Sequence, residues 1–251
     1  MAVKALSAIA CLPALLLLSV GCQGSAYLGL EPPEWKADLE TGDFSQWSQD
    51  GNGGTFTSDN AVLGLVTAPV HGGRYAMRSS INADGNLSYA RAFRQDNLPA
   101  QAFYGVWFYI PEDYTVTGTY WNLFEFSGRN NSSNPNTAIA VWSLNLHQGA
   151  DGESVWYVWD GLRSQEVNPA TPVSPPIGRW FHVLAFIEQA TDQTGRAAFW
   201  IDDVPFVDQR GVSTVPSDWM SWAIGSVSVD IAQNPADLYI DDAMIWQGTP
   251  R

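Results

Sequence analysis

Short runs of apolar or alternating residues, separated by Gly, Pro, Asn and Asp, follow one another along the chain from residue 38 to the end. Alternation with a period of two is typical of β-strands that bury one face. No segment shows a convincing helical period, and no internal repeat is found. The pattern predicts strands in the segments YAMRSS, LSYARAFR, AFYGVWFYI, WNLFEFS, AIAVWSLNLH, SVWYVWDG, WFHVLAFIEQ, GRAAFWIDD, GSVSVDI and LYIDDAMIW.

Strands of this number and spacing predict an all-β domain over residues 38–251, an antiparallel β-sandwich or jelly roll made of two packed sheets. The turn at Asp192–Gly195 predicts a hairpin between two of these strands, and Asp202-Asp203 predicts a second tight turn. The segment NPATPVSPPIG (168–178) contains too many prolines for a strand ladder and is expected to be a loop.

The N-terminus has the pattern of an export signal. Lys4 precedes an apolar run from Ala5 to Gly21, and small residues end it in LSVGC. This pattern predicts a signal peptide over residues 1–21, and its end resembles the lipobox of bacterial lipoproteins, with Cys22 as the lipidated residue. Plain secretion is the alternative, because Ser19 stands where that motif usually has Leu. Residues 22–37, with Gly, Ser and a Pro pair, are expected to be a tether.

Composition narrows the classes of partner. The chain has 12 Lys and Arg against 26 Asp and Glu, a net charge of −14, and no basic run, so the charge pattern of a nucleic-acid-binding protein is missing. Contact with a membrane is expected only through the lipid anchor. Apart from Cys22, the chain has one cysteine, Cys11, inside the predicted signal peptide, so the mature domain is expected to have no disulfide.

Three segments carry a family resemblance: DLETGDFSQW at the start of the domain, GRWFHVLAFIEQATDQTGRAAFWIDDV in its second half and LYIDDAMIW at its end. They resemble the concanavalin A-like lectin/glucanase superfamily. The nearest resemblance, over residues 38–247, is to bacterial laminin-G-like domains and to polysaccharide lyases related to heparin lyase I and alginate lyase. It implies a jelly roll whose concave sheet forms a groove for an extended glycan, but one fold serves many functions.

The same resemblance implies a structural calcium ion near the chain ends. Glu40 and Asp43 lie in the first segment, and Asp241 and Asp242 lie in the last predicted strand. These residues would meet if the terminal strands pair, and a calcium ion would compensate for the missing disulfides. Glu40 and Asp241 are the predicted side-chain ligands. The alternative is that these acids belong to an ordinary turn and to the polar end of a strand.

Side-chain alternation predicts which residues face the groove. In WNLFEFS, Phe124 and Phe126 suit the core, which places Trp121 and Glu125 on the open face. Aromatic rings and a few directed polar groups are typical of a glycan-binding surface. The predicted carbohydrate-binding residues are Arg91, Trp121, Glu125, Asn145, His147 and Trp159.

The sequence alone favours a lyase less than it favours a carbohydrate-binding domain. Jelly-roll lyases remove the proton next to a uronate carboxyl group, so they need an Arg, Asn or Gln to neutralise the carboxylate and a Tyr or His as base and acid. Their signature on this strand is a Gln and a His separated by one residue, whereas here the matching positions are Glu125 and Ser127, and a carboxylate would repel a uronate. If the chain is a lyase, the catalytic candidates are His147, Tyr157 and Arg91.

The sequence therefore predicts an exported, lipid-anchored, monomeric carbohydrate-binding domain whose partner is a polysaccharide. The alternatives are a polysaccharide lyase with a diverged active centre and a non-catalytic adhesion or structural domain. A glycoside hydrolase is least favoured, because it needs two carboxylates across the scissile bond. Positions 123, 127 and 129 around Glu125 are Leu, Ser and Arg.

Overall fold

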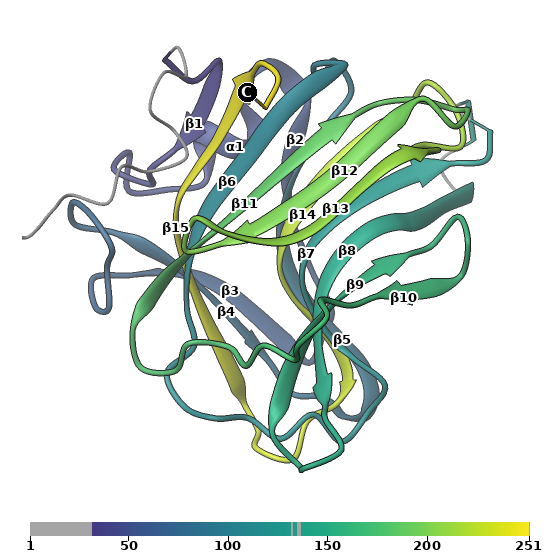
Figure 1. The fold of residues 1–251 in the computed structure, drawn as a ribbon. Coiled ribbons are helices and arrows are strands. Elements are labelled where there is room, and N and C mark those ends of the chain that lie inside the picture. Colours follow the sequence, from purple (N-terminus) through teal and green to yellow (C-terminus); the bar gives the residue numbers. More distant parts are fainter. Residues whose placement is uncertain (1–31, 132, 135–136, 251) are drawn as a thin grey trace, which may run out of the picture.

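The computed structural model describes residues 32–131, 133–134 and 137–250, and the predicted signal peptide and Cys22 lie outside these residues. Almost all of the regular structure consists of antiparallel strands in two sheets, so the predicted all-β sandwich is confirmed. Figure 1 shows the two sheets as layers. Between β1 and β2 lie a short helix, α1 (Ser45–Ser48), and the 3₁₀ turn Gln49–Gly51. No helix in the described part of the chain is long and apolar enough to cross a membrane.

Sheet A contains β1 (Trp35–Ala37), β3 (Ala61–Val66), β4 (Ala76–Ile81), β6 (Gln101–Tyr109), β11 (Trp180–Glu188), β12 (Gly195–Ile201), β13 (Val204–Val212) and β15 (Ala236–Gln247). Its order is β13-β12-β11-β6-β15-β4-β3, and β1 pairs with β15. The predicted hairpin between β11 and β12 is present. Asp202 and Asp203 both have positive φ in the turn to β13, as a two-residue hairpin turn of the I′ type requires.

Sheet B contains β2 (Gly53–Thr57), β5 (Asp84–Gln95), β7 (Trp121–Arg129), β8 (Ala138–Gln148), β9 (Ser154–Asp160), β10 (Gln165–Val167) and β14 (Met220–Asp230). Its order is β10-β9-β8-β7-β14-β5-β2. The strands β7 to β10 are consecutive in the sequence, whereas β7, β14, β5 and β2 are far apart in it, so residues from distant segments meet on one face.

The hydrophobic core lies between the two sheets and is rich in large rings. Sheet A supplies Tyr104 and Phe108, and sheet B supplies Phe124, Trp142 and Trp222. The ring centroids of Tyr104 and Trp222 are 5.3 Å apart, which joins the sheets by direct aromatic contact. Ala90 and Ala92 of β5 and Trp142, Leu144 and Leu146 of β8 enter this core, so the side chains between them face outward on the other face of sheet B.

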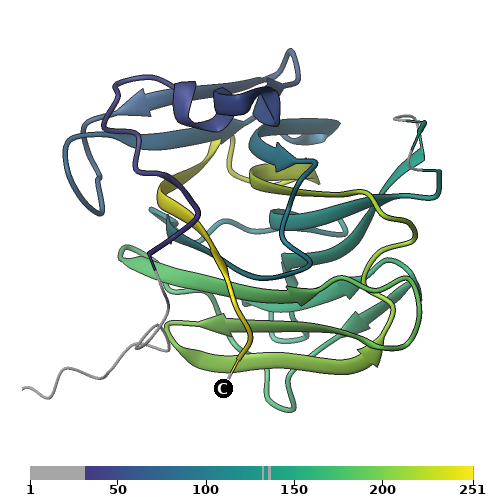
Figure 2. The same cartoon turned by 90° about the horizontal axis from the view of Figure 1, so that it is seen from above.

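The domain begins earlier than the sequence predicted. Residues Trp35–Ala37, assigned to the tether, form β1 and pair with β15 from Ile245 to Ala243. Both Trp35 and Ala37 are buried in the core. Figure 2 shows this first strand beside the yellow C-terminal part of β15. The expected pairing of terminal strands is therefore present, but a strand of three residues after a Pro pair has too short a pattern to be recognised.

A β-bulge in β7 changes which residues face outward. The pairing of β7 with β8 shifts register between Asn122 and Phe124, and its pairing with β14 shifts between Ile224 and Val227. As a result Leu123 and Phe124 both enter the core, because a bulge inserts one extra residue and breaks the alternation. The expected outward position of Trp121 is wrong: its side chain is 1% exposed and belongs to the core.

The outer face of sheet A has its own apolar packing. Phe103, Leu184, Phe186 and Ala198 form a second buried cluster, and Trp200 and Trp246 pack against it. His182 lies on the same face and is buried, and burial lowers the pKa of its imidazole to about 3. This face therefore stabilises the sheet largely through apolar contacts.

Candidate functional site

A cleft of about 420 Å³ opens on the outward face of sheet B. The strands β7, β8, β9, β10 and β14 and the segment before β7 supply its walls. Its lining residues are Thr119, Tyr120, Asn122, Glu125, Ala140, Ser143, Asn145, Tyr157, Trp159, Glu166 and Val227. Amides, carboxylates, phenols and one indole are combined here, a composition that suits a polar ligand with apolar ring faces.

A buried arginine forms one side of the polar network below the cleft. Arg91 of β5 is 4% exposed, and its Nη1 donates a hydrogen bond of 3.0 Å to Oε2 of Glu125. Its Nη2 donates to Oδ1 of Asn122 at 2.7 Å and to the carbonyl oxygen of Ala223 at 3.2 Å. The other carboxylate oxygen of Glu125 accepts from the hydroxyl of Ser127 at 2.5 Å. The charge of Glu125 is therefore compensated by Arg91 inside the protein.

The network continues through two buried amides. Since Oδ1 of Asn122 accepts from Arg91, its Nδ2 faces β8 and donates to Oδ1 of Asn145 at 2.8 Å. Asn145 in turn donates from Nδ2 to the carbonyl oxygen and the hydroxyl of Ser143, both at 3.0 Å. This chain of hydrogen bonds fixes the orientation of both amides, so the cleft floor presents preoriented donors and acceptors.

An imidazole and a phenol lie beside these amides. His147 and Asn145 are two residues apart on β8 and share its outward face, and Asn145 pairs with Tyr157 of β9. The ring centroids of His147 and Tyr157 are 4.7 Å apart. Nδ1 of His147 lies 3.7 Å from Oε1 of Glu166 on β10. The sheet thus brings an amide, an imidazole and a phenol together within one patch.

The two phenols of the cleft hold their protons firmly. Burial raises the pKa of Tyr157, and the nearby Glu166 and Tyr120 raise it further. Burial and the carboxylate of Glu125 raise the pKa of Tyr120, which Arg91 partly offsets. Both phenols are consequently protonated at neutral pH and can donate a hydrogen bond or a proton.

The sequence-based candidates lie in four places. Arg91, Glu125 and Asn145 lie in the network, Trp159 lines the cleft, and His147 stands at its border. Trp121 points into the core instead, as described above. Asn122 was missed, because the bulge at position 123 moves it to the outward face and nothing in the local sequence marks that bulge. The roles of these residues in glycan binding stay predictions.

The side chains of Glu40 and Asp241, the two predicted calcium ligands, accept hydrogen bonds from the loop between β3 and β4. Oε1 of Glu40 accepts from the backbone N–H groups of Arg74 and Tyr75 at 2.8 and 3.0 Å. Oδ2 of Asp241 accepts from the backbone N–H groups of His71 and Gly72 at 3.0 and 3.2 Å.

N–H donors repel a cation, and the described residues contain no group of three or more His, Cys, Asp or Glu side chains suited to a metal. The side chains of Glu40 and Asp241 therefore do not fit the implied ion as they stand. Calcium stays a prediction, which thermal unfolding in calcium and in a chelator checks.

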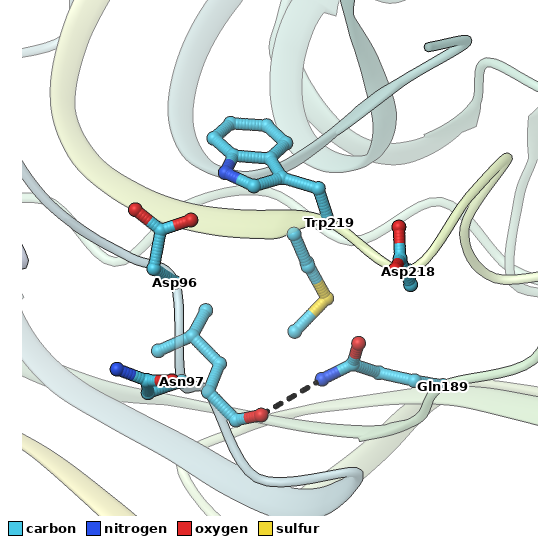
Figure 3. A pocket seen from close by; sticks show the side chains of 7 residues that line it. Asp96, Asn97, Gln189, Asp218 and Trp219 are labelled. Atoms are coloured by element: carbon cyan, nitrogen blue, oxygen red, sulfur yellow. Dashed lines mark hydrogen bonds between the residues drawn. The ribbon is translucent and has the colours of Figure 1, made fainter. Parts of the chain in front are cut away.

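A second pocket, of about 280 Å³, lies where β5 ends and β14 begins (Figure 3). Asp96 and Asp218 line it together with Trp219, and Nε2 of Gln189 donates to the carbonyl oxygen of Leu98 at 3.2 Å. Its lining contains neither His nor Tyr. Two carboxylates without an imidazole or phenol suit acid–base chemistry on a uronate less well than the cleft of sheet B does.

Comparison with known proteins identifies the family. The chain matches the model of the polysaccharide lyase family over residues 39–243. It belongs to the polysaccharide lyase family. None of the curated proteins matches the chain.

Solved structures that share the fold include two polysaccharide lyases and one further protein. The endo-β-1,4-glucuronan lyase from the fungus Trichoderma reesei has a TM-score of 0.63 and 14% identity, with 86% of this chain and 96% of that chain covered. An alginate lyase from Aplysia kurodai has a TM-score of 0.56 and 11% identity, with 87% and 100% covered. The cellulose-induced protein Cip1 has a TM-score of 0.57 and 13% identity, with 84% and 96% covered. The TM-scores and coverage show a shared fold, and together with the family match they confirm the resemblance drawn from the sequence.

Membership of the polysaccharide lyase family revises one argument made from the sequence. An orthodox lyase was disfavoured because Glu125 and Ser127 replace the expected Gln and His on β7. In the structure Glu125 is paired with Arg91, and an amide and an imidazole separated by one residue are found on the neighbouring strand, at Asn145 and His147.

Proposed function

We propose that the chain is a polysaccharide lyase that cleaves a uronate-containing glycan by β-elimination in the cleft of sheet B. The observation that carries the proposal is the patch in which Asn145, His147 and Tyr157 lie together above the Arg91–Asn122 network. This reaction requires an amide donor, a base and an acid, and the cleft offers Asn122, His147 and Tyr157 for these roles. The match to the polysaccharide lyase family supports the same reaction class.

The amide of Asn122 supplies a donor to the substrate carboxylate. One hydrogen of Nδ2 is bonded to Asn145, and an amide carries two, so a second hydrogen remains for a ligand in the cleft that Asn122 lines. Because Arg91 polarises Asn122 through the bond to its Oδ1, this N–H is a stronger donor than that of an isolated amide. It stabilises the charge that develops on the carboxyl group during the reaction.

His147 acts as the base and Tyr157 as the acid. Nδ1 of His147 faces Oε1 of Glu166 at 3.7 Å, so Nε2 is the ring nitrogen assigned to accept the proton from the substrate. Tyr157 is protonated because burial raises its pKa, so it can donate to a leaving oxygen.

In the substrate, the proposed elimination breaks a C–H bond and a C–O bond and forms a carbon–carbon double bond. Nε2 of His147 removes the hydrogen from the carbon next to the uronate carboxyl group. The electron pair of that C–H bond forms a carbon–carbon double bond, and the bond to the glycosidic oxygen breaks. The phenol of Tyr157 gives its proton to this oxygen, and proton exchange with water then restores both side chains.

The product provides the test. The mature protein is incubated with polyglucuronan and with alginate, and absorbance in the near ultraviolet is read together with reducing ends. We expect an unsaturated product from wild type and its loss in Tyr157→Phe. A matched control, Tyr109→Phe on sheet A, keeps wild-type turnover. Retardation by a uronan gel without unsaturated product would instead establish the carbohydrate-binding domain, and neither signal would favour an adhesion domain.

Export and lipid attachment at Cys22 form a separate part of this proposal, supported by the sequence LSVGC after an apolar run. Expression in a bacterium supplied with a radiolabelled fatty acid tests it. Wild type is expected to take up the label in the cell envelope, and Cys22→Ala is expected to lose it. A secreted wild-type protein without label would support plain secretion.

A further inference from the structure

Three aromatic rings gather on sheet B at the edge opposite β10. The ring centroid of Phe56 lies 5.6 Å from that of Tyr89 and 5.6 Å from that of Phe93. Phe56 stands on the edge strand β2, and 41% of it is exposed. A ring that is supported by two others and open to solvent suits ligand contact better than core packing. We call Phe56, Tyr89 and Phe93 the aromatic platform.

The aromatic platform shares its face with the cleft. Phe56 is directly opposite Arg91 in the pairing of β2 with β5, and opposite residues in an antiparallel pair lie on the same face. Tyr89 and Phe93 lie two positions to either side of Arg91 on β5, so they share that face too. Arg91 in turn reaches Glu125 in the cleft wall.

The strand between the cleft and the aromatic platform has short outward side chains. β14 lies between β7 and β5, and its Ala223 pairs with Glu125 on one side and with Phe93 on the other. Ser221, also small, pairs with Ser127 and shares the face with Ala223. Ala223 and Ser221 therefore place no large side chain on this face between the cleft and the platform.

The charge of the protein explains why uncharged contacts matter here. A net charge of −14 opposes the approach of an acidic polymer, so general electrostatic attraction cannot supply its affinity. Aromatic rings stack on the apolar faces of sugar rings independently of net charge. A platform of this kind suits a polyuronate bound by an acidic protein.

We propose that the aromatic platform is a remote subsite that stacks sugar rings of a long uronan chain while its reacting unit lies at His147 and Tyr157. The inference rests on the proposed lyase function. In the order of sheet B, four strand spacings of about 4.8 Å, roughly 19 Å in all, separate β2 from β8. A polymer reaches both places, whereas a trisaccharide bound at His147 does not. The platform therefore makes the protein favour polymer over short oligosaccharides.

The test compares substrates of two lengths. Steady-state rates are measured on polyglucuronan and alginate polymers and on the trisaccharides derived from them. For Phe56→Ala we expect the ratio of kcat/KM for polymer to kcat/KM for trisaccharide to fall roughly five- to tenfold, the effect of losing one stacked ring. Phe56→Trp is expected to keep or raise the ratio. Val62→Ala on sheet A, whose side chain is likewise apolar and is 65% exposed, is the matched control and keeps the ratio.

The outcomes separate the subsite from the lyase function. An unchanged ratio in Phe56→Ala, with wild-type cleavage intact and an unchanged melting temperature, overturns the subsite alone. If wild type cleaves no uronan but is retarded in a uronan gel, a loss of retardation in Phe56→Ala supports the platform and overturns the lyase proposal. Retardation that Phe56→Ala does not weaken, or a wild type that neither cleaves nor is retarded, overturns the platform.

Discussion

The outward faces of the two sheets bury different kinds of side chain. On sheet B, Arg91, Asn122 and Asn145 are buried in a hydrogen-bonded network beside the cleft. On sheet A, Phe103 and Phe186 are buried in an apolar cluster. Apolar packing of the second kind stabilises a sheet without the desolvation penalty that buried charge carries.

A contribution to the stability of the fold does not explain why polar groups are buried on the outward face of sheet B. Replacing a buried ion pair by well-packed apolar groups is often neutral or stabilising. The network also leaves Nε of Arg91 buried without a hydrogen-bond partner among the described residues. Incompletely satisfied polar groups are typical of functional sites, because their arrangement serves a ligand rather than the fold. This contrast supports the proposal that sheet B carries the chemistry, whereas the outer face of sheet A contributes mainly to stability.

The largest expected effect tests whether His147 on sheet B is the base of the reaction. His147→Gln keeps a polar side chain of similar reach but removes the base, so kcat on a uronan is expected to fall by about 10²- to 10⁴-fold. The free energy of unfolding is expected to change little, because His147 lies at the border of the cleft and is partly exposed. Rates of product absorbance and denaturant unfolding measure the two quantities. Turnover above a tenth of the wild-type value would remove His147 from the reaction.

The second effect tests the stabilising side. Phe186 is buried among Phe103 and Leu184 on sheet A, and Phe186→Ala leaves a cavity there. The free energy of unfolding is expected to fall by about 3 kcal/mol. Urea unfolding measures this loss, and kcat at a temperature where the variant is folded is expected to equal that of wild type. A large fall in kcat would show that the two faces are not independent.

The same contrast explains how much the sequence could predict. The sandwich follows from strands with a period of two, and the outward positions of Asn145 and His147 follow from regular alternation along β8. The positions of Trp121 and Asn122 depend on a bulge at Leu123. Leu123 and Phe124 are both apolar, so the sequence does not show that both side chains enter the core. The pairing of Arg91 with Glu125 depends on strand order, which local patterns do not encode.

The smallest effect is a change in the pH dependence of stability, and it concerns His182 on the outer face of sheet A. His182 is buried on sheet A, and burial lowers its pKa to about 3 from an unfolded value near 6.5. Below pH 6.5 the unfolded chain binds a proton that the folded protein does not. The stability that this histidine contributes is therefore full above pH 6.5 and is lost progressively as the pH falls toward 3.

His182→Gln removes this titration, so the fall in the free energy of unfolding between pH 6.5 and pH 4 is expected to become shallower than in wild type. Urea unfolding at a series of pH values measures the slope. Phe186→Ala, on the same face, is the control: it lowers stability at every pH without changing the slope. An unchanged slope in His182→Gln would mean that His182 is protonated in the folded protein. The outer face of sheet A would then tolerate buried charge, and the contrast with sheet B would lose its physical basis.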